Sequence, residues 1–219
     1  MKSETIRVYK FYPQRWALEA IQRKRLKISP FRELNDPFEF LAANVKKKED
    51  RDSFAAAIAS LSKDHGLISF SKSWENPVIW SHYADSHRGI ALGFDIPKDQ
   101  LEKIEYVSER IEISKDKRFD TETISKIKRL KFDHWSYEKE RRLIYKLPLA
   151  DPVTGLYFTG FNETLVLKEI VLGARYTSKS AIQWTEELQM DGVDIITSRL
   201  KFGQFQIGKQ RNKNLWKTL

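Results

Sequence analysis

The chain has 219 residues, no cysteine and a formal net charge of +9 at neutral pH. The lack of cysteine excludes disulfides and thiolate metal sites, and 41% hydrophobic residues with 12% aromatic residues exclude a disordered chain. No segment has the pattern of a signal peptide or of a charge-free membrane span, so we expect a cytoplasmic protein with no membrane partner.

The apolar residues and turn formers predict strands that alternate irregularly with helices. In chain order, we expect a strand at 7–12, a helix at 13–25, strands at 26–29 and at 67–71 on either side of a helix at 52–62, a helix at 77–84, strands at 89–94 and 103–107, a helix within 108–131, strands at 140–147 and 165–173, a helix at 180–189, and strands at 193–197 and 201–207. This order predicts an α+β fold, with one domain over residues 1–219, a mixed or antiparallel sheet and flanking helices.

A turn is expected at Asn35-Asp36-Pro37. The residue before a proline avoids helical geometry, and Asn and Asp side chains bond to nearby backbone groups. We expect Phe38 to pack into the core behind this turn. A ligand contact from Asn35 or Asp36 is the alternative.

Two glutamates, Glu138 and Glu140, stand two residues apart where a strand is expected to begin. Alternate residues of a strand point the same way, so the two carboxylates would lie side by side. Adjacent like charges raise the proton affinity of one of them, which is useful in a catalytic site. The alternative is mutual neutralisation with basic neighbours, above all Arg142, which shares their strand face.

A second candidate segment is Trp80–Asp85, on a short expected helix. Trp80 is expected to pack in the core, whereas His82 and Tyr83 combine a polar tip with an apolar body and are candidates to line a pocket. The four histidines lack the spacing of metal ligands, so no metal is predicted. The chain also lacks a phosphate-binding glycine loop and a dinucleotide fingerprint.

The C-terminal segment, residues 199–219, is basic and contains no acidic residue. Phe202, Phe205 and Trp216 are interleaved with its charges. Cations with aromatic rings between them suit a nucleic-acid partner, and a solvated charged surface is the alternative. The candidate nucleic-acid-binding residues are Arg199, Lys201, Lys209, Arg211 and Lys213.

Several of these motifs occur together in a known order. The motifs NDPFE (35–39), WSHYAD (80–85), GIALGF (89–94) and WSYEKER (135–141) resemble a large bacterial family of domains of unknown function, over a core of residues 8–173. Members of that family occur near mobile-element and phage-defence genes. The resemblance therefore implies an antiviral defence or toxin protein, with a neighbouring defence protein as partner.

The order of a basic residue, two serines and a Glu-x-Glu pair also resembles ADP-ribosyltransferases of the Arg-Ser-Glu kind. That resemblance implies that Arg7 or Lys10 holds the phosphates of an NAD substrate and that Ser71 and Ser73 brace its nicotinamide pocket. Glu140 would stabilise the oxocarbenium-like ribose, and the carboxylate two residues earlier would activate a protein or nucleic-acid acceptor.

Three functions of different classes follow from these patterns. The first is an effector enzyme that transfers ADP-ribose from NAD or hydrolyses NAD, with Glu140, Glu138 and His82 as catalytic residues and with Arg7, Lys10, Ser71, Ser73 and Tyr83 as NAD-binding residues. The second is a nucleic-acid-binding or nuclease-like effector that uses the basic C-terminal segment. The third is a non-catalytic module that acts with a partner protein.

Overall fold

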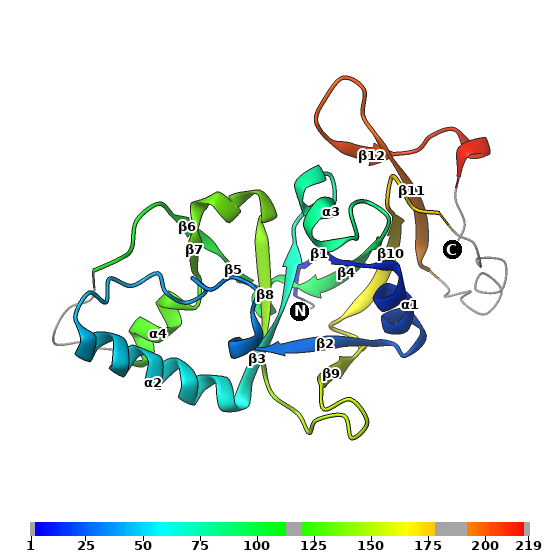
Figure 1. Ribbon diagram of the computed structural model, residues 1–219. Coiled ribbons are helices and arrows are strands. Elements are labelled where there is room, and N and C mark those ends of the chain that lie inside the picture. Colours follow the sequence, from blue (N-terminus) through cyan, green and yellow to red (C-terminus); the bar gives the residue numbers. More distant parts are fainter. Residues whose placement is uncertain (1–2, 113–119, 178–191, 217–219) are drawn as a thin grey trace. The chain divides into compact units, whose positions relative to one another are not determined.

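A computed structural model describes residues 3–112, 120–177 and 192–216 (Figure 1). The chain divides into two compact units, each made of separate chain segments. Unit 1 contains residues 1–26, 70–100 and 160–219, and unit 2 contains residues 27–69 and 101–159. The expected α+β class with a mixed sheet is confirmed. The single domain over 1–219, with a family-like core at 8–173, stays a prediction.

The sheet of unit 1 is built on β1 (Thr5–Tyr12) and β4 (Ile90–Pro97), which pair antiparallel along their whole length. On its other edge β4 pairs antiparallel with β10 (Val166–Leu172), which runs parallel to β11 (Asp194–Leu200). β11 then pairs antiparallel with β12 (Ile207–Lys209). The apolar start of β4 is fully buried, which is typical of a strand that is covered on both faces.

The helices of unit 1 are α1 (Gln14–Gln22) and α3 (Pro77–Tyr83), with short 3₁₀ turns η2 (Lys98–Gln100) and η5 (Lys213–Leu215). In α3 the Asn76 side chain caps the helix by accepting from the Val78 N–H at 2.8 Å. Trp80 is fully buried, packs edge-to-face on Phe11 at 5.0 Å and donates its indole N–H to the Trp74 carbonyl. The expected core position of Trp80 is confirmed.

Unit 2 holds most residues of the remaining elements. They are β2 (Arg25–Pro30), η1 (Phe31–Glu33), α2 (Lys48–Asp64), β3 (His65–Ser71), β5 (Glu102–Lys103), β6 (Glu105–Val107), α4 (Thr121–Ile127), β7 (Leu130–Phe132), η4 (Asp133–Glu138), β8 (Glu140–Lys146) and β9 (Tyr157–Gly160). Three of these, β2, β3 and β9, extend by one or two residues into unit 1. β3 pairs with β2 and β8, β8 pairs antiparallel with β5, and β6 and β7 form a separate parallel pair.

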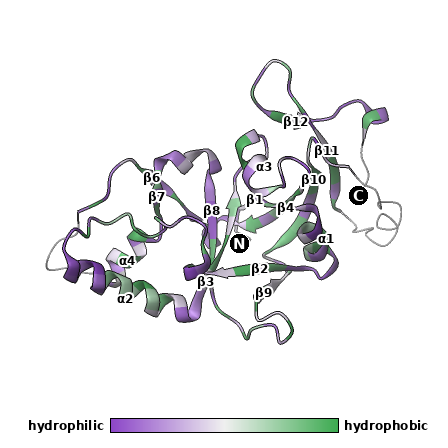
Figure 2. Ribbon diagram, in the orientation of Figure 1, coloured by the Kyte–Doolittle hydropathy of each residue, from purple (hydrophilic) through white to green (hydrophobic). Residues whose placement is uncertain are grey.

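The core of unit 2 gathers Phe31, Phe40, Phe54, Leu67 and Ile127. Hydrophobic residues run along β4 of unit 1, whereas the first turn of α2 in unit 2 is hydrophilic (Figure 2). None of the helices in the described segments is long and apolar enough to cross a membrane.

The turn after Pro37 differs from the sequence expectation. Phe38 was expected in the core but is 59% exposed, and Phe40 is buried there instead at 2%. The Asp36 carboxylate accepts from the Phe38 N–H at 2.9 Å, which confirms the local turn. Phe40 then adopts a left-handed backbone with φ of 64°, so the chain reverses and directs the later ring inward.

Two element boundaries were also wrong, and one expected helix is not tested. α2 begins at Lys48 rather than at residue 52, with acidic residues in its first turn and no side-chain cap. The strand expected at 201–207 is mostly the loop of the β11–β12 hairpin, because only Ile207 and the two residues after it pair with β11. The helix expected at 180–189 lies outside the described residues.

Candidate functional site

Unit 2 contains a buried network of five charged side chains. Glu39 follows the NDPF turn, Lys131 lies on β7, Glu138 ends η4, and Glu140 and Arg142 lie on β8. Each of the five side chains is less than 10% exposed. Buried charges are costly unless they are paired, so their partners decide what the network can do.

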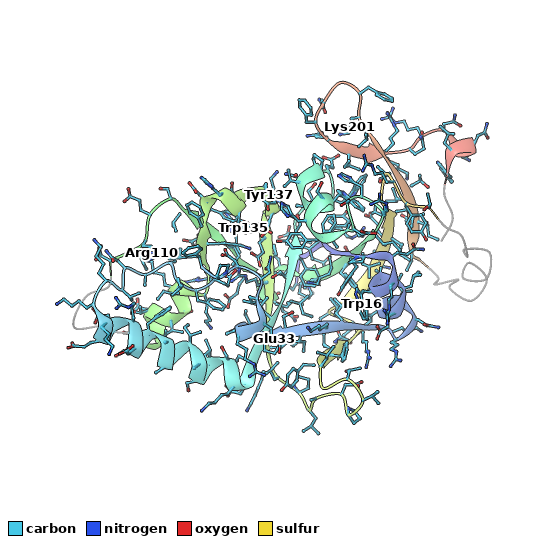
Figure 3. The ribbon with its side chains drawn as sticks, viewed as in Figure 1. Trp16, Glu33, Arg110, Trp135, Tyr137 and Lys201 are labelled. Atoms are coloured by element: carbon cyan, nitrogen blue, oxygen red, sulfur yellow. The ribbon has the colours of Figure 1, made fainter. Side chains whose placement is uncertain are left out.

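Lys131 connects the carboxylates. Its Nζ donates to Glu138 Oε2 at 2.7 Å and to Glu140 Oε2 at 3.0 Å, and it lies 3.9 Å from Glu39 Oε2. The same ammonium group lies 5.0 Å from the centroid of the Trp135 ring. In Figure 3, Trp135 and Tyr137 mark the η4 segment that carries Glu138.

Arg142 forms the second centre. Its guanidinium donates to Glu140 Oε1 at 2.8 Å, to Glu140 Oε2 at 3.0 Å and to Glu39 Oε1 at 2.7 Å. A further N–H reaches the Lys128 carbonyl at 3.0 Å. Glu39 of the NDPFE motif and Arg142, the residue after the WSYEKER motif, therefore meet although they are 103 positions apart in the sequence.

Glu138 and Glu140 lie close together, as expected, but the backbone that positions them differs from the expected single strand. They do not share a strand, because Glu138 ends a 3₁₀ helix, Lys139 is left-handed with φ of 46°, and β8 starts at Glu140. The alternative interpretation, neutralisation by Arg142, is confirmed for Glu140. Lys131, which bonds to both carboxylates, was missed by the sequence analysis.

The network holds Glu140 ionised. Burial raises the pKa of Glu140, but the charge and hydrogen bonds of Arg142, with help from Lys131 and from a hydrogen bond of Ser69, outweigh it and bring the pKa to about 2. For Glu39 burial prevails, so its pKa is raised despite Arg142 and Lys131, and the nearby Glu140 charge adds to the rise.

The lowered pKa of Glu140 predicts that the fold loses stability in acid. Because the pKa of Glu140 is lowered from 4.5 to about 2, its stabilising effect is complete above its unfolded pKa and is lost as pH falls toward 2. The loss amounts to roughly 3 kcal/mol at about 1.4 kcal/mol per pKa unit. The raised pKa of Glu39 acts in the opposite sense, stabilising below its unfolded pKa and losing effect as pH rises. Urea unfolding between pH 5 and pH 2 would measure the balance, and an unfolding free energy that does not fall in this window would contradict a paired Glu140.

A pocket of about 240 Å³ lies in the same unit. Its wall is mostly apolar, with Leu41, Leu130 and Phe132, and it also includes Lys131 of the network. Four exposed residues also line the pocket: Phe38, Ser108, Glu109 and Arg110. The Arg110 guanidinium lies 5.8 Å from the Phe38 ring centroid (Figure 3 labels Arg110). Lys131 thus belongs both to the pocket wall and to the charge network.

The expected phosphate-binding residues lie on β1 in unit 1. Arg7 is already paired, since it donates to Asp95 at 3.1 Å and also contacts Glu169. Glu169 additionally accepts from the Tyr9 hydroxyl at 2.8 Å. Lys10 lies on the same strand with its ammonium 5.7 Å from the Tyr12 ring centroid. Asp95 and Glu169 compete with any anion for Arg7.

The two expected serines form a local turn in unit 1. The Ser71 hydroxyl donates to the Ser73 carbonyl at 2.9 Å and accepts from the Ser73 N–H at 3.2 Å. Ser73 Oγ accepts from the Glu75 N–H at 3.2 Å. The serine that hydrogen-bonds to Glu140 is Ser69, two residues before Ser71 on β3. The sequence contains two overlapping Ser-x-Ser patterns, 69–71 and 71–73, and the prediction used the second one.

The remaining candidates are also on unit 1. His82 is exposed and Tyr83 half-buried, with ring centroids 6.0 Å apart. His87, one turn beyond α3, stacks on Trp80, and its Nε2 lies 3.1 Å from Ser81 Oγ. Among the predicted catalytic and NAD-binding residues, the structure brings Glu138 and Glu140 together, and a shared cleft for the whole set stays a prediction.

The basic C-terminal candidates lie around the β11–β12 hairpin. Arg199 is on β11, Lys201 in the hairpin loop and Lys209 on β12, followed by Arg211 and by Lys213 in η5. Within the segments that the structure describes, no cluster of three or more His, Asp or Glu side chains is arranged to hold a metal ion.

Comparisons with protein families, with curated proteins and with solved structures found no match to this chain. The fold and site define an α+β protein with a buried charge network beside a small apolar pocket. The resemblances to the bacterial family and to ADP-ribosyltransferases stay predictions.

Proposed function

We propose that unit 2 carries the active site of an NAD-consuming effector enzyme, which cleaves the bond between nicotinamide and ribose. The observation that supports this most is the fixed, ionised carboxylate of Glu140, held by Arg142, Lys131 and Ser69. Cleavage of an N-glycosidic bond develops positive charge on the ribose, and a preorganised carboxylate in a dry site stabilises such charge strongly. A carboxyl group with a pKa near 2 acts as an electrostatic stabiliser at neutral pH and not as a general acid.

The charge balance of the network supports the same chemistry. Three carboxylates, those of Glu39, Glu138 and Glu140, face the two cations Lys131 and Arg142. When all five are ionised the network carries one excess negative charge. Such an excess favours a cationic group such as the nicotinamide ring of NAD, and burial strengthens the attraction.

The pocket supports a ligand with a ring and a phosphate. Phe38 offers an exposed face for stacking on a heteroaromatic ring, and Arg110 beside it offers a planar donor set for a phosphate. The volume of 240 Å³ is below the roughly 300–1,000 Å³ of pockets that enclose drug-sized ligands. It therefore suits the nicotinamide riboside part, with the adenosine part outside.

In the proposed reaction the C1′–N bond of the ribose breaks and its electron pair leaves with neutral nicotinamide. An acceptor hydroxyl or water then forms the new C1′–O bond. Glu138, which shares Lys131 with Glu140, takes the proton released from that oxygen. The acceptor is a protein, a nucleic acid or water, and a defence-related role follows only from the family resemblance.

The test is the release of nicotinamide from NAD by the purified protein. We expect Glu140→Gln to lower kcat by about 10²–10³-fold, as removal of a preorganised electrostatic group does. Glu33→Gln, on the exposed η1 turn of the same unit, is the matched control and should retain the wild-type rate.

Because Glu140 is buried, thermal unfolding of each variant must accompany the assay. Phe38→Ala and Arg110→Ala change pocket residues outside the charge network, so they should raise KM while the protein stays folded. Equal rates for wild type and Glu140→Gln, or no release by folded wild type, would refute the proposal. If the folded wild type releases no nicotinamide and its biological activity depends on a neighbouring protein, the non-catalytic partner module is favoured.

A further inference from the structure

Two aromatic side chains in the β11–β12 hairpin are exposed to solvent. Arg199 lies opposite Gly208 and Leu200 opposite Ile207, which closes a loop over residues 201–206. In this loop Phe202 is 97% exposed and Phe205 is 99% exposed. Neither ring therefore contributes to a hydrophobic core in the described chain.

The loop is braced, so the rings are presented by an ordered hairpin. The Lys201 N–H donates to the Gln206 carbonyl at 2.9 Å, and the Lys201 ammonium donates to the Gln206 side chain at 2.8 Å. At the base of the loop, Ile207 is fully buried and its N–H donates to the Glu75 carbonyl at 2.8 Å. Such bracing lowers the entropy cost when a partner binds to the rings.

Cations surround the rings. The Arg199 guanidinium lies 5.8 Å from the centroid of the Phe202 ring. Beyond β12, the Lys213 ammonium lies 5.8 Å from the Trp216 ring, whose indole N–H donates to the Gln210 carbonyl at 3.0 Å. The sequence from Arg199 to Leu219 contains no acidic residue, so the charge of this segment favours an anionic partner.

We propose that this aromatic hairpin, residues 199–213, binds single-stranded nucleic acid. Phe202 and Phe205 would stack on unpaired bases while Arg199, Lys209 and Arg211 contact the phosphates, which is how strand-binding proteins combine rings and charge. Gly203 and Gln204 separate the two rings. The amide of Gln204 suits a base edge, whereas a tip that enters a lipid bilayer would need an uninterrupted apolar surface. The inference does not depend on NAD chemistry in unit 2.

Fluorescence anisotropy with a labelled single-stranded oligonucleotide of mixed sequence, as DNA and as RNA, tests the proposal. We expect Phe202→Ala and Phe205→Ala each to weaken binding about tenfold, since a stacked base contributes about 1–3 kcal/mol. Leu149→Ala and Val153→Ala remove other fully exposed apolar side chains, in unit 2, and should leave the affinity unchanged.

The salt dependence of binding distinguishes the contribution of charge from that of base stacking. Lys209→Gln should lower the slope of log K against log salt by about 0.7, the value for one phosphate contact on a single strand, whereas Phe202→Ala should lower affinity and leave the slope unchanged. The proposal is overturned if the affinity for the oligonucleotide does not change with salt concentration, or if the Phe202→Ala/Phe205→Ala double variant binds as tightly as the wild type. Binding to vesicles of anionic lipid without binding to either oligonucleotide also overturns it, in favour of a lipid surface.

Discussion

Arg142→Met is expected to lower the free energy of unfolding by about 3–5 kcal/mol, the typical cost of removing one partner from a buried ion pair. The Arg142 side chain is 1% exposed and bonds to both Glu39 and Glu140. Without the guanidinium, two buried carboxylates lose a hydrogen-bonded cation, and Lys131 alone must balance three acids. Equilibrium urea unfolding measures the effect.

Arg141→Met is the matched control, because Arg141 is the adjacent residue of β8 and its side chain donates to the backbone carbonyl of Glu140 at 3.0 Å. We expect a cost below about 1 kcal/mol for this change, as for most substitutions outside the core. Adding Glu140→Gln to Arg142→Met should recover part of the loss, since the two residues are coupled. Equal destabilisation by Arg141→Met and Arg142→Met would show that the network does not stabilise the fold.

Gly173→Ala is expected to destabilise unit 1 by about 3 kcal/mol or more, at the upper end of overpacking effects. A Cβ at Gly173 would be built directly against the His87 carbonyl oxygen, with the His87 carbonyl carbon at 2.8 Å and the Gly89 carbonyl oxygen at 2.9 Å. These are backbone atoms, so they cannot rotate away as a side chain can. The Gly173 N–H also donates to the Gly89 carbonyl at 3.0 Å, and any shift would strain that bond.

Gly160→Ala provides the comparison for Gly173→Ala. Its added Cβ would meet only the Lys24 carbonyl oxygen, at the ordinary contact distance of 3.8 Å, so the unfolding midpoint should stay near that of the wild type. Chemical denaturation followed by tryptophan fluorescence measures both variants. A Gly173→Ala protein as stable as Gly160→Ala would contradict the close backbone approach at His87.

The elements that the sequence predicted best carry a strong local signal. Residues 89–94 are apolar throughout and form the buried start of β4, and Pro13 precedes a helix as its fixed φ favours. The turn at Asp36 was expected from its own side chain and is held by it. In each case the cause of the structure lies within a few residues.

The charge network could be predicted only in part. Glu138, Glu140 and Arg142 stand close in sequence, so their pairing was an explicit alternative. Glu39 joins them from 103 residues away, and Lys131 sits in a short strand that the sequence analysis included in a charged, partly helical stretch. Local patterns do not encode which distant segments meet, and so the sequence did not predict that Lys131 and Glu39 join the network.

The position of Phe38 shows a second limit. A single left-handed residue, Phe40, decides which of two nearby aromatic rings enters the core and which one faces the pocket. Non-glycine residues adopt this backbone rarely, so sequence patterns favour the wrong ring. Tertiary packing around Phe31, which contacts the Phe40 ring at 5.0 Å, selects the conformation.

The long-range register of the unit 1 sheet has a consequence for how the protein is made. Val8 of β1 pairs with Phe94 of β4, and Phe94 pairs in turn with Leu167 of β10. The neighbour of β1 that is translated first is β3, where Ser71 pairs with Tyr9. At 5–20 residues per second, that pairing partner is synthesised roughly 3–12 s after β1. Both edges of β1 must remain unpaired throughout that interval, so chaperone capture of the growing polypeptide is expected to raise the yield of folded protein.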